Sequence, residues 1–324
     1  MKLCLLIFVQ TVFAVEEWNS FKVTYHKVYQ NPDEENFRQN VFLENLKLIK
    51  AQNEKYEQGL SSFSVGVNRF TDLSKQELFS SKPSAHFDSS VKIGSSGPSF
   101  TQDVPDSIDW RDFGVISRVY DQLLCQSCWA FAVVGAIEPH VAIHEQRNVS
   151  LSEQNLIDCV DSNFACDDYL DREIVDKTYQ YIINNNGIDT LESYPNIYYS
   201  VGSCNFSAEN VGARILGYAN VTEGDEEELK SVVGTLGPVT VVITTDMAWS
   251  VYQDGVYYKE NCMNTTEIFN HAAVIVGYGN DNGEDYWLVK NSWGFWFGDG
   301  GYIKMARNRE NNCGIASIAR YPLI

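Results

Sequence analysis

Two cysteines three positions apart, Cys125 and Cys128, lie in the segment DQLLCQSCWAFA over residues 121–132. Cysteines at this spacing can form a redox-active pair, supply half of a metal site, or combine one structural sulfur with one reactive thiol. A redox enzyme would pair the two with each other, and a zinc site would need a second Cys or His pair at matching spacing. The sequence offers no such second pair, so no metal site is predicted.

The cysteine count favours a reactive thiol. The chain has eight cysteines, and Cys4 lies in an apolar N-terminal leader, so seven remain in the rest of the chain. An odd number leaves one sulfur outside any set of disulfides. Cys128 begins the apolar segment CWAFAVVGAIEPHVAIHE, which predicts a buried helix from Cys128 to about Glu145. The start of a helix favours the thiolate, which is the nucleophilic form, so Cys128 is the candidate nucleophile.

A cysteine nucleophile needs an imidazole base, and three histidines follow residue 104. His140 and His144 lie on the helix of Cys128, about 18 Å along it, which is too far to reach the thiol. Their spacing would suit a metal, but without a further ligand we interpret them as structural or surface residues. His271 begins an apolar strand, and Asn291 at the end of another strand could orient its imidazole.

The N-terminus predicts export. Leu3 to Val15 is almost wholly apolar but only about 13 residues long, well short of the ~20 that a spanning helix needs, so residues 1–15 are predicted to be a cleaved signal peptide. No later stretch is apolar enough to span a membrane. Export implies an oxidising compartment, with the lysosome or the extracellular space as destination. Four N-x-S/T sequons agree with this route: Asn148, Asn205, Asn220 and Asn264.

Acidic residues dominate the later part of the chain. From residue 104 onward there are 13 Lys and Arg against 31 Asp and Glu, whereas residues 16–103 carry 10 against 12. A surface this acidic disfavours nucleic acid and anionic membranes as partners.

The order of the elements predicts an α+β protein. Six residues spaced by three or four positions fall on one helix face: Glu34, Arg38, Phe42, Asn45, Ile49 and Asn53. Residues 80–103 are rich in Ser, Gly and Pro and predict a linker, so the domain boundary is placed between 16–103 and 104–324. After residue 104 helical patterns come first and short β-branched strands second, which predicts two unlike halves with a site between them.

Taken together, DQLLCQSCWAFA, NHAAVIVGYG and YWLVKNSWGFWFGDGGY resemble the catalytic blocks of papain-like cysteine peptidases. His271 and Asn291 lie 143 and 163 positions after Cys128, near the spacing typical of that family. The helix stripe completes the family's E-R-F-N-I-N propeptide motif, and NNCGIASIARYP is similar to the C-terminus of cathepsin L-like members. A second propeptide motif, G-x-N-x-F-x-D, is complete at Gly66, Asn68, Phe70 and Asp72.

The resemblance implies a papain-like two-subdomain fold, with a helical half, a β-barrel-like half, a cleft between them and an N-terminal α-helical inhibitory prodomain. It implies that Cys128 is the nucleophile, His271 the acid and base, and Asn291 the group that fixes the imidazole. Gln122 and the backbone N–H of Cys128 would stabilise the oxyanion. No cofactor is implied.

The resemblance also implies the disulfides Cys125–Cys166, Cys159–Cys204 and Cys262–Cys313. It places Leu170, Val242, Phe269, Ala272 and Ile318 in an apolar pocket that should prefer Leu, Val or Phe two residues before the scissile bond. Trp293 would shield the His–Asn contact. Gln126, Asp168 and Tyr169 would also line the substrate groove.

The sequence departs from the family at this groove. Bulkier residues stand where the family has small ones: Leu123, Leu124, Gln126, Asp168, Tyr169 and Trp296, with Phe297 in place of a second Trp. We therefore weigh three functions. The first is an endopeptidase made as an acid-activated zymogen, with polypeptide substrates. The second is a nearly inactive homologue that binds other proteins because its groove is filled. The third is a disulfide oxidoreductase, which would pair Cys125 with Cys128.

Partners follow from the first of these functions. The chain should act as a monomer, with its own propeptide as an intramolecular inhibitor. Protein inhibitors of the family should bind more weakly than usual, because a rigid inhibitor tolerates added bulk in the groove poorly.

Overall fold

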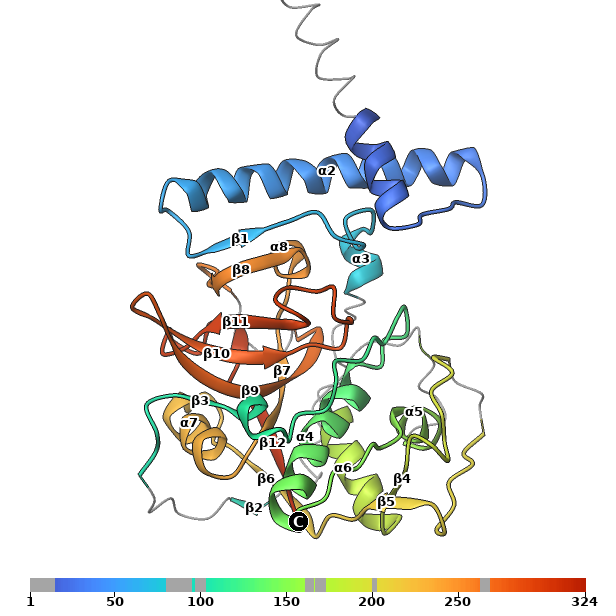
Figure 1. The fold of residues 1–324 in the computed structure, drawn as a ribbon, viewed down its shortest axis with the longest axis vertical. Helices are drawn as coiled ribbons and strands as arrows, with labels where there is room; N and C mark the ends of the chain where they lie inside the picture. The colour runs from blue at the N-terminus through green and yellow to red at the C-terminus, as the bar shows by residue number, and fades with distance from the viewer. Residues whose placement is uncertain are drawn as a thin grey trace, which may run out of the picture.

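The structure, a computed structural model, describes residues 15–79, 95–96, 103–160, 166, 173–199, 203–262 and 269–324. Residues 15–79, called here the N-terminal unit, lie across one end of residues 103–324, the C-terminal body (Figure 1). Residues 1–14 and most of the predicted linker are outside the described residues, so the proposed signal peptide stays a prediction.

One side of the C-terminal body is helical. Its main helix, α4 (Cys128–Glu145), begins and ends at the predicted residues and is buried over most of its length. Helix α5 (Glu153–Cys159) begins after Ser152, whose side chain accepts a hydrogen bond from the Asn155 backbone and so caps the helix. The remaining elements of this half are α6 (Ile174–Asn184) and the short pair β4 (Ile188–Asp189) and β5 (Val211–Ala213).

The other side is a sheet with the strand order β1-β8-β11-β10-β9-β7-β12-β6-β2, and β3 pairs with β9. Neighbours are antiparallel except for the pairs β8–β11 and β2–β6. The strands of the body and of the segment before it are β2 (Ser95–Ser96), β3 (Ile108–Asp109), β6 (Gly217–Asn220), β7 (Val239–Ile243), β8 (Tyr252–Tyr257), β9 (His271–Asp281), β10 (Glu284–Lys290), β11 (Tyr302–Ala306) and β12 (Ile318–Leu323). Short helices accompany them: η1 (Trp110–Phe113), α7 (Glu226–Thr235), α8 (Met247–Ser250) and η2 (Asn312–Gly314). The predicted α+β architecture is confirmed.

Helix α4 packs against β9 where the two halves meet. A Cβ at Gly135 of α4 would lie 3.0 Å from a Val274 methyl carbon, so glycine permits the close approach of helix and strand. The apolar side chains of α4 belong to the same core cluster as those of β7, β9 and β12. The first residue of α4 and the first residue of β9 are thereby fixed relative to each other.

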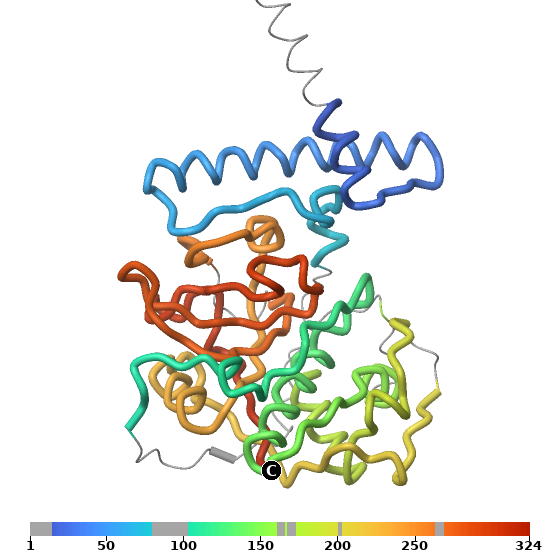
Figure 2. The backbone as a smooth tube through the Cα atoms, viewed as in Figure 1, coloured from blue at the N-terminus to red at the C-terminus, as the bar shows by residue number. Residues whose placement is uncertain are grey.

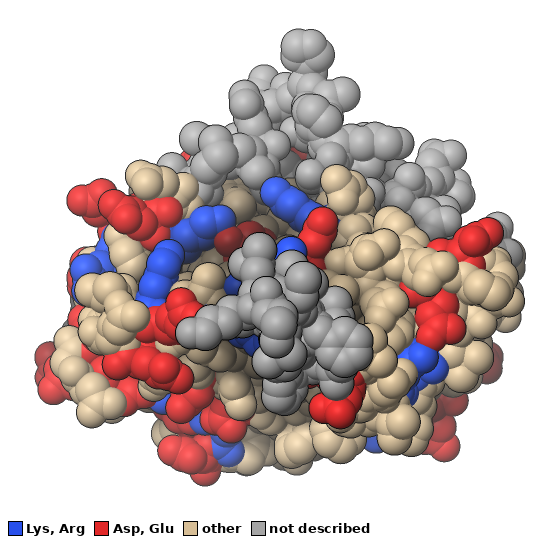
Figure 3. Space-filling model, turned by 90° about the horizontal axis from the view of Figure 1, so that it is seen from above, with Lys and Arg blue, Asp and Glu red and all other residues tan. Residues whose placement is uncertain are grey.

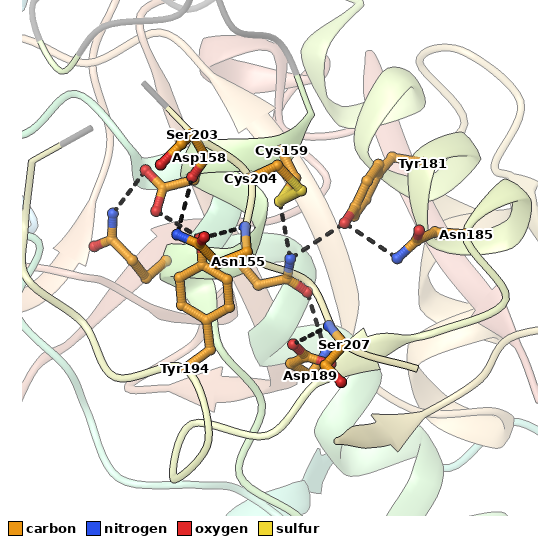
Figure 4. Close-up of a disulfide and its surroundings, with 12 residues drawn as sticks. Asn155, Asp158, Cys159, Tyr181, Asn185, Asp189, Tyr194, Ser203, Cys204 and Ser207 are labelled. Atoms are coloured by element: carbon orange, nitrogen blue, oxygen red, sulfur yellow. Dashed lines mark hydrogen bonds between the residues drawn. A yellow bond between two sulfur atoms is a disulfide. The ribbon is translucent and has the colours of Figure 1, made fainter. Parts of the chain in front are cut away.

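A polar network around the disulfide Cys159–Cys204 fixes the helical half (Figure 4). The Asn155 amide donates to Cys159 Sγ at 3.2 Å and to the Tyr181 hydroxyl at 3.1 Å. Its oxygen accepts from the backbone N–H of Asp189 at 3.1 Å, so one side chain joins α5, α6 and β4.

The predicted helix stripe organises the N-terminal unit. It lies on α2 (Pro32–Glu57), which packs through Phe42 against the helical residues 15–24. The Asn45 amide donates to the carbonyls of Thr71 and Leu73 at 2.9 and 3.1 Å. Asn53 donates to the Val65 carbonyl and accepts from its N–H. The stripe therefore binds the backbone of the segment that leads to the short helix α3 (Lys75–Leu78).

Asp72 is the buried ionic centre of the N-terminal unit. Its side chain is almost fully buried and accepts from Lys27 Nζ at 2.7 Å and from the Tyr29 hydroxyl at 2.9 Å. Arg38 donates to the Asp72 carbonyl at 3.3 Å and pairs with Glu77 at 2.7 Å. The two propeptide motifs of the sequence thus meet at one cluster.

The two units share a sheet. Strand β1 (Phe63–Val65) of the N-terminal unit pairs antiparallel with β8 of the body, and the two lie side by side along the chain trace (Figure 2). The Asn68 amide donates to the Ser250 carbonyl at 2.8 Å. At Gly255, a Cβ would lie 2.2 Å from the Ser62 carbonyl oxygen, so only glycine admits this approach.

Seen from the end that the N-terminal unit covers, acidic and basic side chains are interspersed over the described surface (Figure 3).

Candidate active site

Cys128 is the one free cysteine among the described residues, and it is the first residue of α4. Its side chain is buried, and the backbone N–H groups of Ala272 and Trp129 favour its thiolate. This interaction with Ala272 brings Cys128 to the start of β9, whose first residue is His271. The predicted nucleophile and the predicted base therefore come from the two halves of the body.

His271 is hydrogen bonded to Asn291. The imidazole Nε2 lies 2.8 Å from the Asn291 Oδ1, and Asn291 directly follows β10, the hairpin partner of β9. Because a side-chain carbonyl oxygen accepts, Nε2 carries the proton, which leaves Nδ1 as the basic nitrogen of the neutral ring. The Asn291 Oδ1 also accepts from the Ser292 backbone at 2.8 Å, which fixes the amide.

Aromatic rings surround the imidazole. Trp293 and Trp249 lie with ring centroids 5.0 and 5.1 Å from that of His271, and Phe297 packs against both tryptophans. Burial lowers the pKa of His271 to about 4, against the opposing effect of the Asn291 hydrogen bond. Trp293 lies where the sequence placed it. Trp249 was not anticipated, because its contact with His271 depends on the tertiary position of α8.

Gln122 lies at the base of the loop before Cys128. Its Oε1 accepts from the Ser292 hydroxyl at 2.6 Å, and its Nε2 donates to the Cys125 carbonyl at 2.8 Å. An amide nitrogen has two hydrogens, so one remains for a further acceptor. Ser292 was not predicted, although its place directly after Asn291 is the signal that could have found it.

Burial of Cys128 favours the neutral thiol over the thiolate. Burial raises the pKa of Cys128 to about 11, which outweighs the backbone hydrogen bonds that favour the thiolate. At neutral pH a thiol with this pKa is ionised to only about one part in 10⁴, so it is a poor nucleophile. Burial acts in the same direction at His271, so it favours the uncharged form of both side chains.

The apolar pocket residues are close to one another. Val242 pairs with Ile318 on one side and with Ala272 on the other, across β12, β7 and β9. Phe269 belongs to the same buried cluster. Leu170 is outside the described residues, as are Asp168 and Tyr169.

Most of the described bulky side chains that differ from the family pattern are exposed to solvent. Leu123 and Leu124 are 49% and 78% exposed, so they form apolar surface instead of packing against the body. Trp296 is likewise 78% exposed, whereas Phe297 is buried against Trp249 and takes a structural place. Gln126 is half-buried, and its backbone donates to the Cys166 carbonyl at 2.8 Å.

The disulfides agree with the pairing that the resemblance implies. Cys125 pairs with Cys166, Cys159 with Cys204, and Cys262 with Cys313. Because Cys125 is bonded to Cys166, the spacing of Cys125 and Cys128 does not form a redox pair. The disulfide oxidoreductase hypothesis is therefore wrong.

Known proteins match the chain over nearly its whole length. Residues 104–323 match the papain family cysteine proteases, and residues 6–78 match the cathepsin propeptide inhibitor domain I29. A cathepsin S of Bos taurus is 40% identical, covering 95% of this chain and 92% of its own. A cathepsin L-like peptidase of Aedes aegypti is 39% identical, with 95% and 93% covered. The solved digestive procathepsin L2 of Tenebrio molitor larval midgut superposes with a TM-score of 0.87 at 39% identity, over 96% and 100% of the two chains.

The chain therefore belongs to the papain family of cysteine proteases. It is a cathepsin L-like cysteine peptidase whose N-terminal unit is a propeptide inhibitor domain, so the structure is that of a zymogen.

Proposed function

We propose that the protein is an endopeptidase in which Cys128, His271 and Asn291 catalyse peptide-bond hydrolysis. The observation that carries this proposal is the 2.8 Å hydrogen bond between His271 Nε2 and Asn291 Oδ1, which leaves Nδ1 of the ring as a base for Cys128, the one free cysteine of the described residues.

In the proposed reaction His271 takes the Cys128 proton, and the thiolate attacks the scissile carbonyl carbon. The oxyanion accepts hydrogen bonds from the Cys128 backbone N–H and from the free Nε2 hydrogen of Gln122. His271 then gives its proton to the leaving amine, the C–N bond breaks, and a thioester remains. Water attacks the thioester with His271 as base, which releases the acid and restores the thiol.

We propose that low pH triggers the release and cleavage of the inhibitory segment, residues 16–103. The N-terminal unit depends on paired carboxylates, with Asp72 bound by Lys27 inside it and Asp121 of the body bound by Arg69. Protonating a paired carboxylate removes the attraction, so low pH weakens both the unit and its docking. Cleavage just before Val104 would then free residues 104–324. After removal the Cys128–His271 pair meets water, which lowers the pKa of the thiol.

The proposed localisation and glycosylation follow from the predicted export of the chain. Among the described residues no helix is long and apolar enough to cross a membrane. We propose passage through the secretory pathway to the lysosome or the cell exterior, with glycans at exposed Asn148 and Asn205. Asn220 lies within β6 and is half-buried, so it is the least accessible of the described sequons, and Asn264 lies outside the described residues. A monomer that prefers Leu, Val or Phe in the Val242–Ala272–Ile318 pocket completes the proposal.

The test incubates the full chain at pH 4 and pH 7, then adds an epoxide thiol-peptidase inhibitor and a fluorogenic dipeptide. We expect shortening, labelling of Cys128 and turnover at pH 4 only, and none of these with Cys128→Ala. Labelling without turnover would favour the binding protein with a filled groove. A precursor that stays at full length and is equally reactive at both pH values would contradict the zymogen proposal.

A further inference from the structure

An ion pair that the proposed reaction does not use joins the two units beside the active site. Both terminal nitrogens of the Arg69 guanidinium bind the Asp121 carboxylate: Nη1 contacts Oδ2, and Nη2 donates to Oδ1 at 2.6 Å. The same Nη2 donates to the Trp293 carbonyl at 3.0 Å. Two parallel bonds to a carboxylate are the strongest and most selective arrangement for arginine. The side chains are each 25% exposed, so water reaches the pair.

The acceptors of Arg69 belong to the C-terminal body and are fixed without it. Asp121 Oδ1 also accepts from the Leu123 backbone N–H at 2.9 Å, which orients the carboxylate. Asp121 and Trp293 are paired through an isolated β-bridge, and the Gly294 N–H donates to the Tyr120 carbonyl at 2.9 Å. A Cβ at Gly294 would lie 3.0 Å from Asp121 Oδ2, so glycine leaves the carboxylate room. Removing the N-terminal unit thus exposes a preformed arginine acceptor.

This acceptor lies on the side of the active site from which the leaving group departs. Asp121 directly precedes Gln122, and the Trp293 ring packs on His271 at 5.0 Å. His271 gives its proton to the leaving amine, so the chain that follows the scissile bond runs past this imidazole and the residues around it. In the precursor, Arg69 occupies this place, and the ring of its neighbour Phe70 packs at a tilt against Trp293, with centroids 4.9 Å apart.

We propose that in the processed protein Asp121 and the Trp293 carbonyl bind the side chain of an arginine that follows the scissile bond in the substrate. Arg69 is then the precursor's own occupant of this subsite. Lysine should bind less well, because a point charge on a flexible stem makes one of the two parallel bonds. This inference rests on the proposed endopeptidase function and names a part of its substrate class.

The test uses internally quenched peptides that differ at one position only. The first, second and third residues after the scissile bond are changed in turn to Arg, Lys, norleucine or Glu, at fixed ionic strength. At one of these positions we expect kcat/KM for Arg to exceed that for norleucine by about fivefold, with Lys between them, as befits a partly exposed charge pair. Asp121→Asn keeps the acceptor for the Leu123 N–H and should reduce the ratio of Arg to norleucine to near one. Asp121→Lys should favour Glu.

The matched control is Glu192→Gln, which removes one exposed carboxylate from the helical half and should leave the ratio of Arg to norleucine unchanged. A ratio near one at all three positions, or a ratio that Asp121→Asn does not alter, would overturn the inference.

A binding measurement separates this inference from the proposed function. Cys128→Ala protein, freed of its N-terminal unit by pepsin, is titrated with the same peptides by fluorescence anisotropy. Tighter binding of the Arg peptide that is lost with Asp121→Asn supports the subsite even if the wild-type protein turns over nothing. Equal binding of the Arg and norleucine peptides overturns the subsite even if turnover is fast.

Discussion

His140 and His271 are two buried histidines in one molecule, and we propose a part in catalysis for His271 alone. Both are almost inaccessible, and burial lowers the pKa of each to about 4. Each ring uses Nε2 for one hydrogen bond, His140 with the Pro238 carbonyl at 3.0 Å and His271 with Asn291. Burial, pKa and hydrogen bonding do not tell them apart.

The difference lies in what surrounds the rest of each ring. His140 lies in the middle of α4, stacked at 6.0 Å on His144, with no thiol in reach. His271 begins a strand beside the free thiol and is enclosed by Trp249 and Trp293. A perturbed pKa therefore points to a functional site only when a reaction partner lies beside it.

The largest difference between the two histidines should appear in peptide turnover. His271→Ala should lower kcat/KM of the processed protein by about 10⁴-fold, because it removes the base of a nucleophile–base pair. His140→Gln should leave kcat/KM within about twofold of wild type, because its ring touches neither the thiol nor Asn291. Fluorogenic peptide kinetics measure both. Comparable losses in the two variants would show that His271 is no more important for turnover than His140.

The two histidines should look alike when stability is measured. The folded pKa of about 4 lies below the ordinary value of 6.5, so the unfolded chain binds more protons between these values, and stability is lost as pH falls from 6.5 towards 4. Each should contribute up to about 3 kcal/mol to this loss. In Cys128→Ala precursor, His140→Gln or His271→Gln should each flatten the dependence of urea unfolding on pH. A slope that neither variant changes would show that the rings titrate normally.

The hydrogen-bond partner of His271 should matter next. Asn291→Ala removes the acceptor that orients the ring, and we expect kcat to fall by about 100-fold with little change in KM. Stopped-flow acylation and steady-state kinetics of the processed protein measure this. An unchanged kcat would mean that the tryptophans alone orient the imidazole.

The smallest effect concerns the neighbour of His140. Positive charge on the exposed His144 lowers the pKa of His140, so His144→Gln should raise that pKa by a few tenths of a unit, as expected for a partly screened pair. NMR titration of the His140 ring in Cys128→Ala precursor measures it, and the His271 resonance serves as the internal control. A larger shift of His271 than of His140 would contradict this assignment.

Local patterns predicted much of this molecule. The apolar run after Cys128 predicted α4 with its bounds, and the spacing of the propeptide stripe predicted the face of α2 that binds the segment around Thr71. The contact between Arg69 and Asp121 was not predictable, because it depends on how two units dock across 52 positions of sequence. The outward direction of Leu124 was missed for a related reason. A residue type at a loop position indicates bulk, whereas backbone geometry decides where that bulk points.

The shared sheet has a consequence for the protein after processing. Once β1 is cut away, β8 becomes an outer strand with unpaired backbone N–H and C=O groups on one side. Such an edge can template pairing with another chain and so lead to aggregation. Asp254 stands exposed in the middle of β8, and a charge at an edge strand opposes that pairing. Asp254 thus opposes aggregation of the body at an edge that is exposed only once the N-terminal unit has been removed.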